Sequence, residues 1–274
     1  MSKNSDVEFF LSLMPSLKKW YNIIILYLSQ FLIFIFIMSF FWWISSIHYL
    51  GAISGQILVS ILLVIFYIYL ANNAEKIRKK YLSKYKNLAG QAFWYRYQSY
   101  TIPIISAVFY FPLILKTDYF LPSITSMPKH FITNTLLPIY IAIPASIILI
   151  FIGLFMRRFS GGYGMAVDDY FYVIYPEKSK LLNTGMYSFI RNPQYLSRGI
   201  ISIGFGFFAN NISAIIVGII HFISYCAIIP AEDKELTRRF EDDFLHYKKT
   251  VPVLFPKYGK WRGFVKYLFT FSKN

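Results

Sequence analysis

The stretch GIISIGFGFFANNISAIIVGIIHFISYCAIIPA, residues 199–231, decides how the chain crosses a membrane, because its 33 residues include no Lys, Arg, Asp or Glu. A membrane-spanning helix needs roughly 20 mostly apolar residues. The stretch therefore forms either one long tilted helix or two short helices, over 194–209 and 212–230, that turn at Asn210-Asn211. The two arrangements place the C-terminal segment on opposite sides of the membrane.

The rest of the chain is similarly apolar. Of its 274 residues, 56% are hydrophobic and 20% are aromatic, whereas soluble domains are roughly 45–50% apolar. The sequence therefore predicts an all-α integral membrane protein. Further stretches without charged side chains are long enough for a helical hairpin and two more spanning helices. These helices are expected over 22–46, 52–72, 98–115 and 134–156.

The distribution of basic residues favours the arrangement with two short helices. With six spans and a cytosolic N-terminus, the internal segments 1–21, 73–100, 157–193 and 231–274 hold 3, 7, 5 and 10 Lys plus Arg. Cytoplasmic loops carry an excess of Lys and Arg. A single span over 199–231 would place the ten basic residues of 231–274 on the outer side of the membrane. We therefore predict about six transmembrane helices, with the N- and C-termini both cytosolic and the C-terminal core built on a helical hairpin.

The net charge of +15 follows from this asymmetry, so no nucleic-acid partner is needed to explain it. The basic run 75–86 would lie against anionic lipids. We divide the chain into 1–100, a transmembrane hairpin plus a basic cytosolic loop, and 101–274, a transmembrane core. In that core, 231–249 has helical periodicity, and the segment from Trp261 resembles an interfacial helix. The oligomeric state and the particular membrane stay open.

A candidate site lies where the fifth span begins. Asn192 is a preferred helix N-cap residue, and Pro193 suits the first helical position. A helix start offers unpaired N–H groups to an anion, and Arg191 would reinforce it. If the hairpin turns at Asn210-Asn211, Arg191 and Glu232 return to the same depth. The pair is then either an interfacial salt bridge or part of a site.

The cluster around this pair is larger than one anchoring salt bridge requires, because Tyr187, Tyr195 and Asp233 join it. Charged residues in membrane segments are candidates for function. The sequence has no His or Cys spacing typical of a metal site and no phosphate-binding glycine motif, and SGGYG at 160–164 is more typical of a turn. A reaction whose reactive group belongs to a cofactor fits such a site.

These residues resemble a known pattern. The segments TGMYSFIRNPQY (184–195), AEDKEL (231–236) and FEDDFLHYKKTVPVLFP (240–256) are similar to the core of the isoprenylcysteine carboxyl methyltransferase and phospholipid methyltransferase superfamily. The resemblance covers 184–256. The chain departs from the pattern at three positions, with Asn192 in place of a histidine, Ser197 in place of a glycine and Asp233 in place of a second glutamate.

The resemblance implies S-adenosylmethionine-dependent methyl transfer at the cytosolic membrane face, to a lipophilic acceptor that enters from the bilayer. The acceptor is a phospholipid amine headgroup or an isoprenylcysteine-type carboxylate. It implies catalytic roles for Arg191, Glu232 and Asp233. The cofactor-binding residues that it implies are Tyr187, Arg191, Asn192, Pro193, Tyr195, Gly199 and Glu232.

Two other functions stay open at this point. NADPH-dependent membrane sterol reductases have a similar core, with a helix start that resembles Asn-Tyr-x-Gly-Glu. Here Tyr195 is followed by Leu196, Ser197 and Arg198, without a glutamate, which argues against a reductase. A non-catalytic lipid-binding membrane protein that departs from an enzyme ancestor is the third interpretation, and the departures at Asn192, Ser197 and Asp233 favour it.

Overall fold

The computed structural model describes residues 14–47, 51–114, 136–159, 173–178 and 180–270, and every regular element in these residues is a helix. The predicted all-α fold is thus confirmed for this part of the chain. The glycine motif 160–164 lies outside the described residues. The long helices are α2 (Trp20–Ile47), α3 (Gly51–Tyr85), α4 (Ala89–Ile114), α6 (Ile139–Phe159), α8 (Pro193–Ala209), α9 (Ile212–Thr250) and α10 (Trp261–Phe269).

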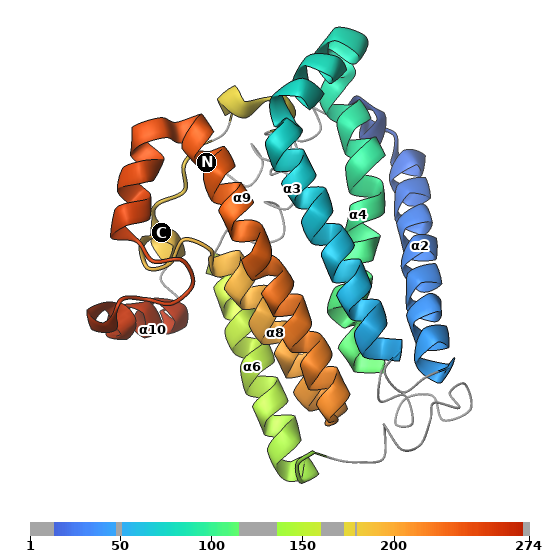
Figure 1. Cartoon of the computed structure of the whole chain (residues 1–274), viewed down its shortest axis with the longest axis vertical. Helices are drawn as coiled ribbons and strands as arrows, with labels where there is room; N and C mark the ends of the chain where they lie inside the picture. Colours follow the sequence, from blue (N-terminus) through green and yellow to red (C-terminus); the bar gives the residue numbers. More distant parts are fainter. Residues whose placement is uncertain (1–13, 48–50, 115–135, 160–172, 179, 271–274) are drawn as a thin grey trace.

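Four stretches of the described chain are long and apolar enough to cross a membrane: Trp20–Ile44, Ile53–Phe111, Ile139–Arg158 and Ile212–Thr250. They indicate a membrane protein. The second contains α3 and most of α4, which run side by side (Figure 1). Helix α8 has 17 residues, slightly fewer than the roughly 20 that a span needs. The number of spans and the side of the termini therefore stay predictions.

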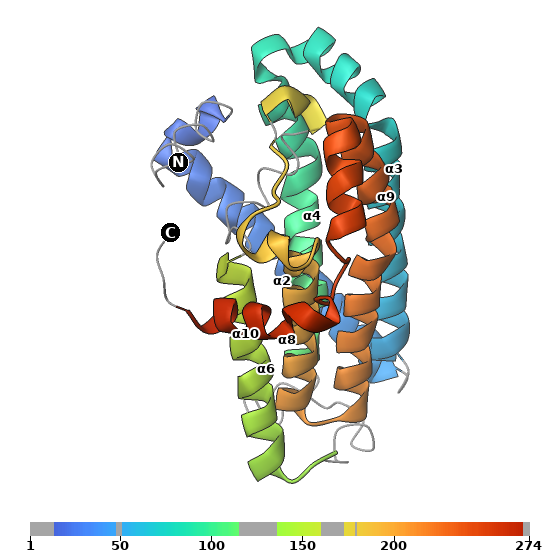
Figure 2. The ribbon, with the colours of Figure 1, turned by 90° about the vertical axis from the view of Figure 1, so that its left-hand side faces the viewer.

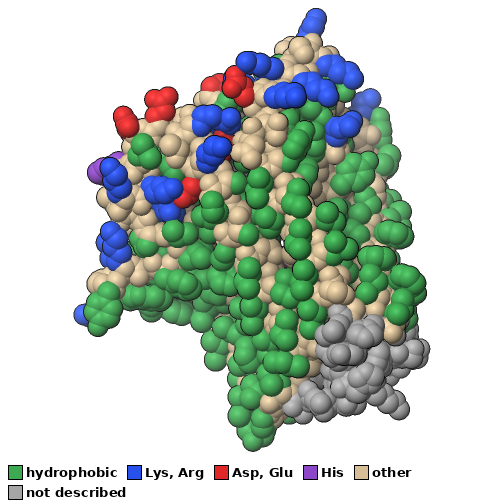
Figure 3. Space-filling view, in the orientation of Figure 1, with side chains coloured by type: hydrophobic (Ala, Val, Ile, Leu, Met, Phe, Trp, Pro, Cys, Tyr) green, Lys and Arg blue, Asp and Glu red, His purple; other side chains and the backbone are tan. Residues whose placement is uncertain are grey.

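The surface of the bundle divides into an apolar body and a charged end (Figure 3). Leu32 and Phe36 on α2 are 66% and 73% exposed, as expected for side chains that face lipid rather than water. In the view of Figure 3, the charged side chains gather at the end where α3 meets α4 and where α9 ends. This separation agrees with the uneven distribution of charge along the sequence.

The prediction of a basic loop over 73–100 is wrong, because most of this segment is helical. Helix α3 continues to Tyr85, and α4 begins at Ala89. A helix needs only one apolar stripe to pack. Ile77 and Tyr81 supply that stripe against Phe93, while the basic side chains lie on the other faces. The short 3₁₀ turn Lys86–Leu88 joins the two helices.

Helix α8 packs between α6 and α9, which also contact it most extensively (Figure 2). Glycines allow the close approach. A Cβ on Gly153 of α6 would lie 2.9 Å from the carbonyl oxygen of Ser197, and one on Gly218 of α9 would lie 2.7 Å from that of Ser202. Small residues at such crossings let helix backbones pack closely inside membranes.

The turn between α8 and α9 falls at Asn210-Asn211, as predicted. Asn210 has a positive φ of 52°, which suits a helix C-terminus, and its side-chain Nδ2 donates to the carbonyl of Leu137 at 2.8 Å. Asn211 caps α9, because its Oδ1 accepts a hydrogen bond from the N–H of Ala214 at 2.8 Å. Two successive asparagines thus end one helix and begin the next.

Helix α9 also contains the predicted amphipathic helix 231–249, which continues α9 rather than forming a separate element. Glu241 interrupts it with φ 45° and ψ −122°, and the last turns fold back toward the start of α8 (Figure 1). Helix α10 lies across the bundle beside α6 (Figure 2). Its Phe264 and Leu268 pack against protein, and its position at the membrane interface stays a prediction.

Candidate functional site

The start of α8 is held by a segment far along the chain. Helix α8 begins at Pro193 as predicted, and the N–H groups of Arg191 and Asn192 donate to the carbonyls of Pro252 and Val253 at 2.8 and 3.0 Å. The predicted side-chain cap is wrong, because the Asn192 side chain makes no capping bond and donates instead to Val253 at 3.3 Å. The segment 251–253 thus fixes the backbone where α8 begins.

Arg191 forms its ion pair with Asp233, not with Glu232 as expected. Its Nη1 lies 2.6 Å from Asp233 Oδ1, and the two side chains are 6% and 12% exposed. Lys248 Nζ lies 2.9 Å from the other carboxylate oxygen, Oδ2. Adjacent residues on a helix point about 100° apart, so Glu232, at the same depth, faces another side of α9.

Tyr187 is tied to α8 and to the end of α9 by hydrogen bonds. Its carbonyl accepts a bond from the hydroxyl of Tyr247 at 2.7 Å. Its own hydroxyl accepts one from the Gln194 side chain at 3.2 Å. Tyr247 and Lys248 both lie beyond the kink at Glu241, so the folded-back end of α9 contacts Tyr187, just before α8, and Asp233, earlier in α9.

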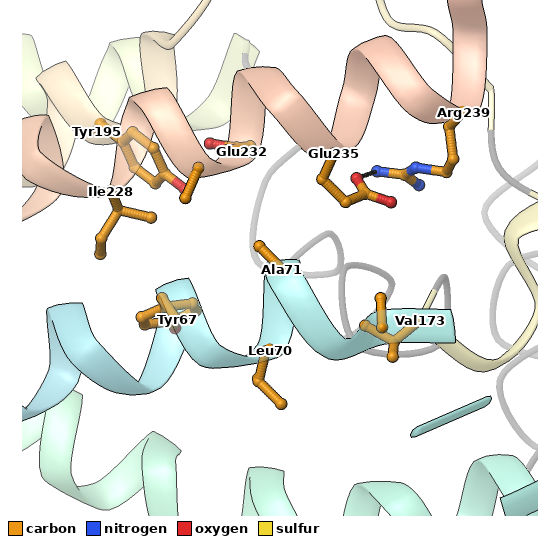
Figure 4. A pocket seen from close by; sticks show the side chains of 11 residues that line it. Tyr67, Leu70, Ala71, Val173, Tyr195, Ile228, Glu232, Glu235 and Arg239 are labelled. Atoms are coloured by element: carbon orange, nitrogen blue, oxygen red, sulfur yellow. Dashed lines mark hydrogen bonds and ion pairs between the residues drawn. The ribbon is translucent and has the colours of Figure 1, made fainter. Parts of the chain in front are cut away.

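Glu232 instead lines a pocket between α3 and α9 (Figure 4). The pocket has a volume of about 110 Å³, several times the roughly 10–15 Å³ that one water molecule needs by the same measure. Tyr67 and Tyr195 lie at one end of the pocket, and Glu235 and Arg239 at the other (Figure 4). The lining residues are Tyr67, Leu70, Ala71, Ala74, Val173, Tyr195, Ile228, Ala231, Glu232, Glu235 and Arg239.

The charges in this pocket are partly balanced. Arg239 Nη2 lies 2.6 Å from Glu235 Oε2, and the more exposed Arg238 lies 3.8 Å from Glu235 Oε1. The Tyr195 ring stacks on Tyr225, with centroids 5.1 Å apart and planes 18° apart. Carboxylates and tyrosine faces both attract cations and hydrogen-bond donors. The pocket can therefore hold a ligand that carries positive charge and hydroxyl groups.

The remaining predicted residues lie outside the pocket lining. Gly199 packs under the Phe222 ring, which an added Cβ would approach to 2.1 Å. Ser197 is buried, and its hydroxyl donates to the carbonyl of Gln194 at 2.8 Å. The departure from the family glycine at Ser197 therefore falls at the crossing with α6. Asn192 and Pro193 hold the helix start instead of lining the pocket.

Sequence reasoning missed two contributors to the site. Tyr67 comes from α3, more than a hundred residues before the motif region, and no local signal relates it to the pocket. Lys248 is one of several basic residues in an amphipathic stretch, and only the kink at Glu241 brings it to Asp233. The ion pair of Glu235 and Arg239 was predictable from the sequence, because side chains four residues apart on a helix are neighbours.

The fold and this site define a helical membrane protein with a mostly apolar pocket that carries two carboxylates near its charged end. The sequence model of the family "Phospholipid methyltransferase" matches residues 138–243, less than half of the chain. The match runs from the start of α6 to just beyond the kink in α9 and includes Arg191, Tyr195, Glu232 and Asp233. The resemblance to this group of membrane methyltransferases is thereby confirmed.

One curated relative supports a partial similarity. The nickel-cobalt-cadmium resistance protein NccN of Alcaligenes xylosoxydans xylosoxydans is 31% identical over 98 residues, which are 35% of this chain and 46% of the relative. The matched region thus spans about half the length of that relative. No solved structure matches the chain.

Proposed function

We propose that this protein transfers a methyl group from S-adenosylmethionine to a lipophilic acceptor at the cytosolic face of a membrane. The observation that carries the proposal is the pocket between α3 and α9, in which Glu232 and Tyr195 come from the segment that matches the phospholipid methyltransferase family. An apolar pocket with a few convergent polar groups is typical of a ligand site.

The pocket fits the cofactor by its chemistry. S-adenosylmethionine combines a positively charged sulfonium with ribose hydroxyls and an aromatic base, and it would supply a methyl group that the sulfonium already activates. Glu232 would accept hydrogen bonds or face the positive charge, and Tyr195 would offer an aromatic surface. The apolar residues Leu70, Val173 and Ile228 would exclude water around them.

The contacts of Asp233 suggest a positioning role rather than a catalytic one. Both of its carboxylate oxygens contact cations, Arg191 Nη1 and Lys248 Nζ, within the protein. The cluster ties the start of α8 to two parts of α9 and would hold Tyr195 and Glu232 at a fixed separation. Alignment of reacting groups is a main source of catalysis in such transfers.

The charge of the pocket favours an amine acceptor over a carboxylate acceptor. Glu232 and Glu235 would repel a carboxylate and attract an ammonium group. An ammonium group must lose a proton before it attacks a methyl group. Glu232 is our candidate for the base, because it lines the pocket beside Tyr195 in the segment that matches the family.

Methyl transfer is tested with the purified protein in phospholipid vesicles and S-adenosylmethionine labelled on the methyl group. We expect label in a lipid product. We expect Glu232→Gln to lower that rate by about a hundredfold or more, because a general base contributes roughly 10²–10⁴-fold. Glu75→Gln is the control, since Glu75 is an exposed residue of α3, and it should leave the rate unchanged.

Other outcomes would contradict the proposal. Saturable binding of NADPH without binding of S-adenosylhomocysteine would favour a reductase. Binding of neither cofactor would favour a lipid-binding protein without catalysis. Equal rates of methyl transfer in the Glu232 and Glu75 variants would show that Glu232 has no role in the reaction.

A further inference from the structure

The second arginine of α8, Arg198, has surroundings unlike those of Arg191. It lies five residues after Pro193, about 7.5 Å further along the helix. Its guanidinium carbon is 5.4 Å from the centroid of the Tyr225 ring, and that ring stacks on Tyr195, with centroids 5.1 Å apart. Arg198 thus lies beside a stacked pair of tyrosines.

The positive charge of Arg198 is not neutralised within the described part of the chain. Arg191 and Arg239 each have a carboxylate at 2.6 Å, whereas no carboxylate of the described residues lies within 4 Å of the Arg198 guanidinium. A guanidinium does not lose its proton in proteins. Tyrosine rings stabilise a cation but add no negative charge, so the site retains a net positive charge.

This charge lies next to the inner end of the pocket. Tyr195, which stacks on the ring that Arg198 faces, forms that end with Tyr67, opposite Glu235 and Arg239 (Figure 4). Arg198 itself lies behind these lining residues. Side chains on a helix lean toward its N-terminus, so Arg198 leans toward the start of α8. The ligand space therefore has carboxylates toward the charged end of α9 and a cation on its bilayer side.

We propose that Arg198 binds the anionic group of the ligand in this pocket, and that this group is the phosphate of the acceptor lipid. The inference rests on the proposed function. A phospholipid whose chains lie in the bilayer carries its phosphate deeper than its amine. That order matches Arg198 on the bilayer side and Glu232 beyond it. The carboxylate of S-adenosylmethionine is the alternative anionic group that Arg198 could bind.

The test compares two lipids that share an amine and differ in the phosphate. Wild-type protein and the variants Arg198→Gln and Arg198→Lys are purified in detergent. Their binding of phosphatidylethanolamine, of a long-chain alkylamine without phosphate, and of S-adenosylhomocysteine is then measured separately. Arg96→Gln serves as a matched control, because Arg96 is an exposed arginine on α4.

We expect Arg198→Gln to weaken phosphatidylethanolamine binding about tenfold or more, as for the loss of a charged hydrogen bond. Binding of the alkylamine and of S-adenosylhomocysteine should stay unchanged. Arg198→Lys should restore part of the loss, and the control should resemble wild type. The Tm of Arg198→Gln should fall only slightly, because the change loses the contact with the Tyr225 ring but breaks no ion pair among the described residues.

The other outcomes are equally distinct. A loss confined to S-adenosylhomocysteine binding would assign the anion to the cofactor and overturn the phosphate assignment. Equal loss for both lipids, or a lowered Tm with no change in binding, would overturn the site and leave a packing role. If wild-type protein binds the lipid but forms no labelled product, the proposed function fails while the anion site stands.

Discussion

At the scale of single residues, Asp233 holds the site together. One carboxylate is shared between a buried arginine and a half-exposed lysine that arrive from different segments. The cost of breaking a buried ion pair comes from the charge that is left behind without a partner. The two partners of Asp233 differ in burial, so their removal should have different effects.

Asp233→Asn leaves Arg191 buried without a carboxylate, and we expect the protein to lose about 3 kcal/mol of stability or more. Lys248→Gln should cost about 1 kcal/mol or less, because the Lys248 side chain is 44% exposed. Thermal unfolding in detergent measures both. Similar Tm values for the two variants would show that Asp233 does not carry the buried pair.

At the scale of elements, the kink in α9 is the feature that shapes the site. Without it, α9 would continue straight and Tyr247 and Lys248 would move away from Tyr187 and Asp233. Glu241 adopts φ 45° and ψ −122°, a region that residues with a Cβ rarely occupy and that costs of order 1–3 kcal/mol. The contacts beyond the kink compensate for that strain.

Glu241→Gly should therefore stabilise the protein, by about 1 kcal/mol, because glycine adopts this conformation without strain. The neighbouring exposed residue Asp242 lies in ordinary helix, so Asp242→Gly should destabilise it by a similar amount. Tm measured for both variants checks the signs. A lower Tm for Glu241→Gly would mean that the observed backbone conformation is not strained.

At the scale of the whole molecule, the charged end and the apolar body set the orientation in the membrane. The turn between α3 and α4 and the end of α9 share the charged end, and the start of α6 lies at the opposite end (Figure 1). If the basic residues face the cytosol, these two ends lie on opposite sides of the bilayer.

Single cysteines test this orientation in a Cys226→Ser background. We expect Leu136→Cys, before α6, to react with a membrane-impermeant thiol reagent added to intact cells. Lys79→Cys, near the end of α3, should react only after the cells are opened. Reaction of Lys79→Cys in intact cells would place the basic end outside and the candidate pocket with it.

The sequence by itself determined the membrane character, the turn at Asn210-Asn211, the start of α8 at Pro193 and the resemblance to methyltransferases. These depend on composition, local turn chemistry and motif order, all of which act over short distances. It also placed Arg191 at the depth of Glu232, since helix rise is constant.

Only the tertiary structure decided which acidic residue faces Arg191, that Tyr67 of α3 completes the pocket, and that Asn192 donates to the carbonyl of Val253 instead of capping α8 with its side chain. Each of these depends on helix rotation and on contacts between distant segments. Local periodicity does not specify a rotation to within the 100° or so that separates Glu232 from Asp233. Packing against α3 and α8, together with the kink at Glu241, fixes it.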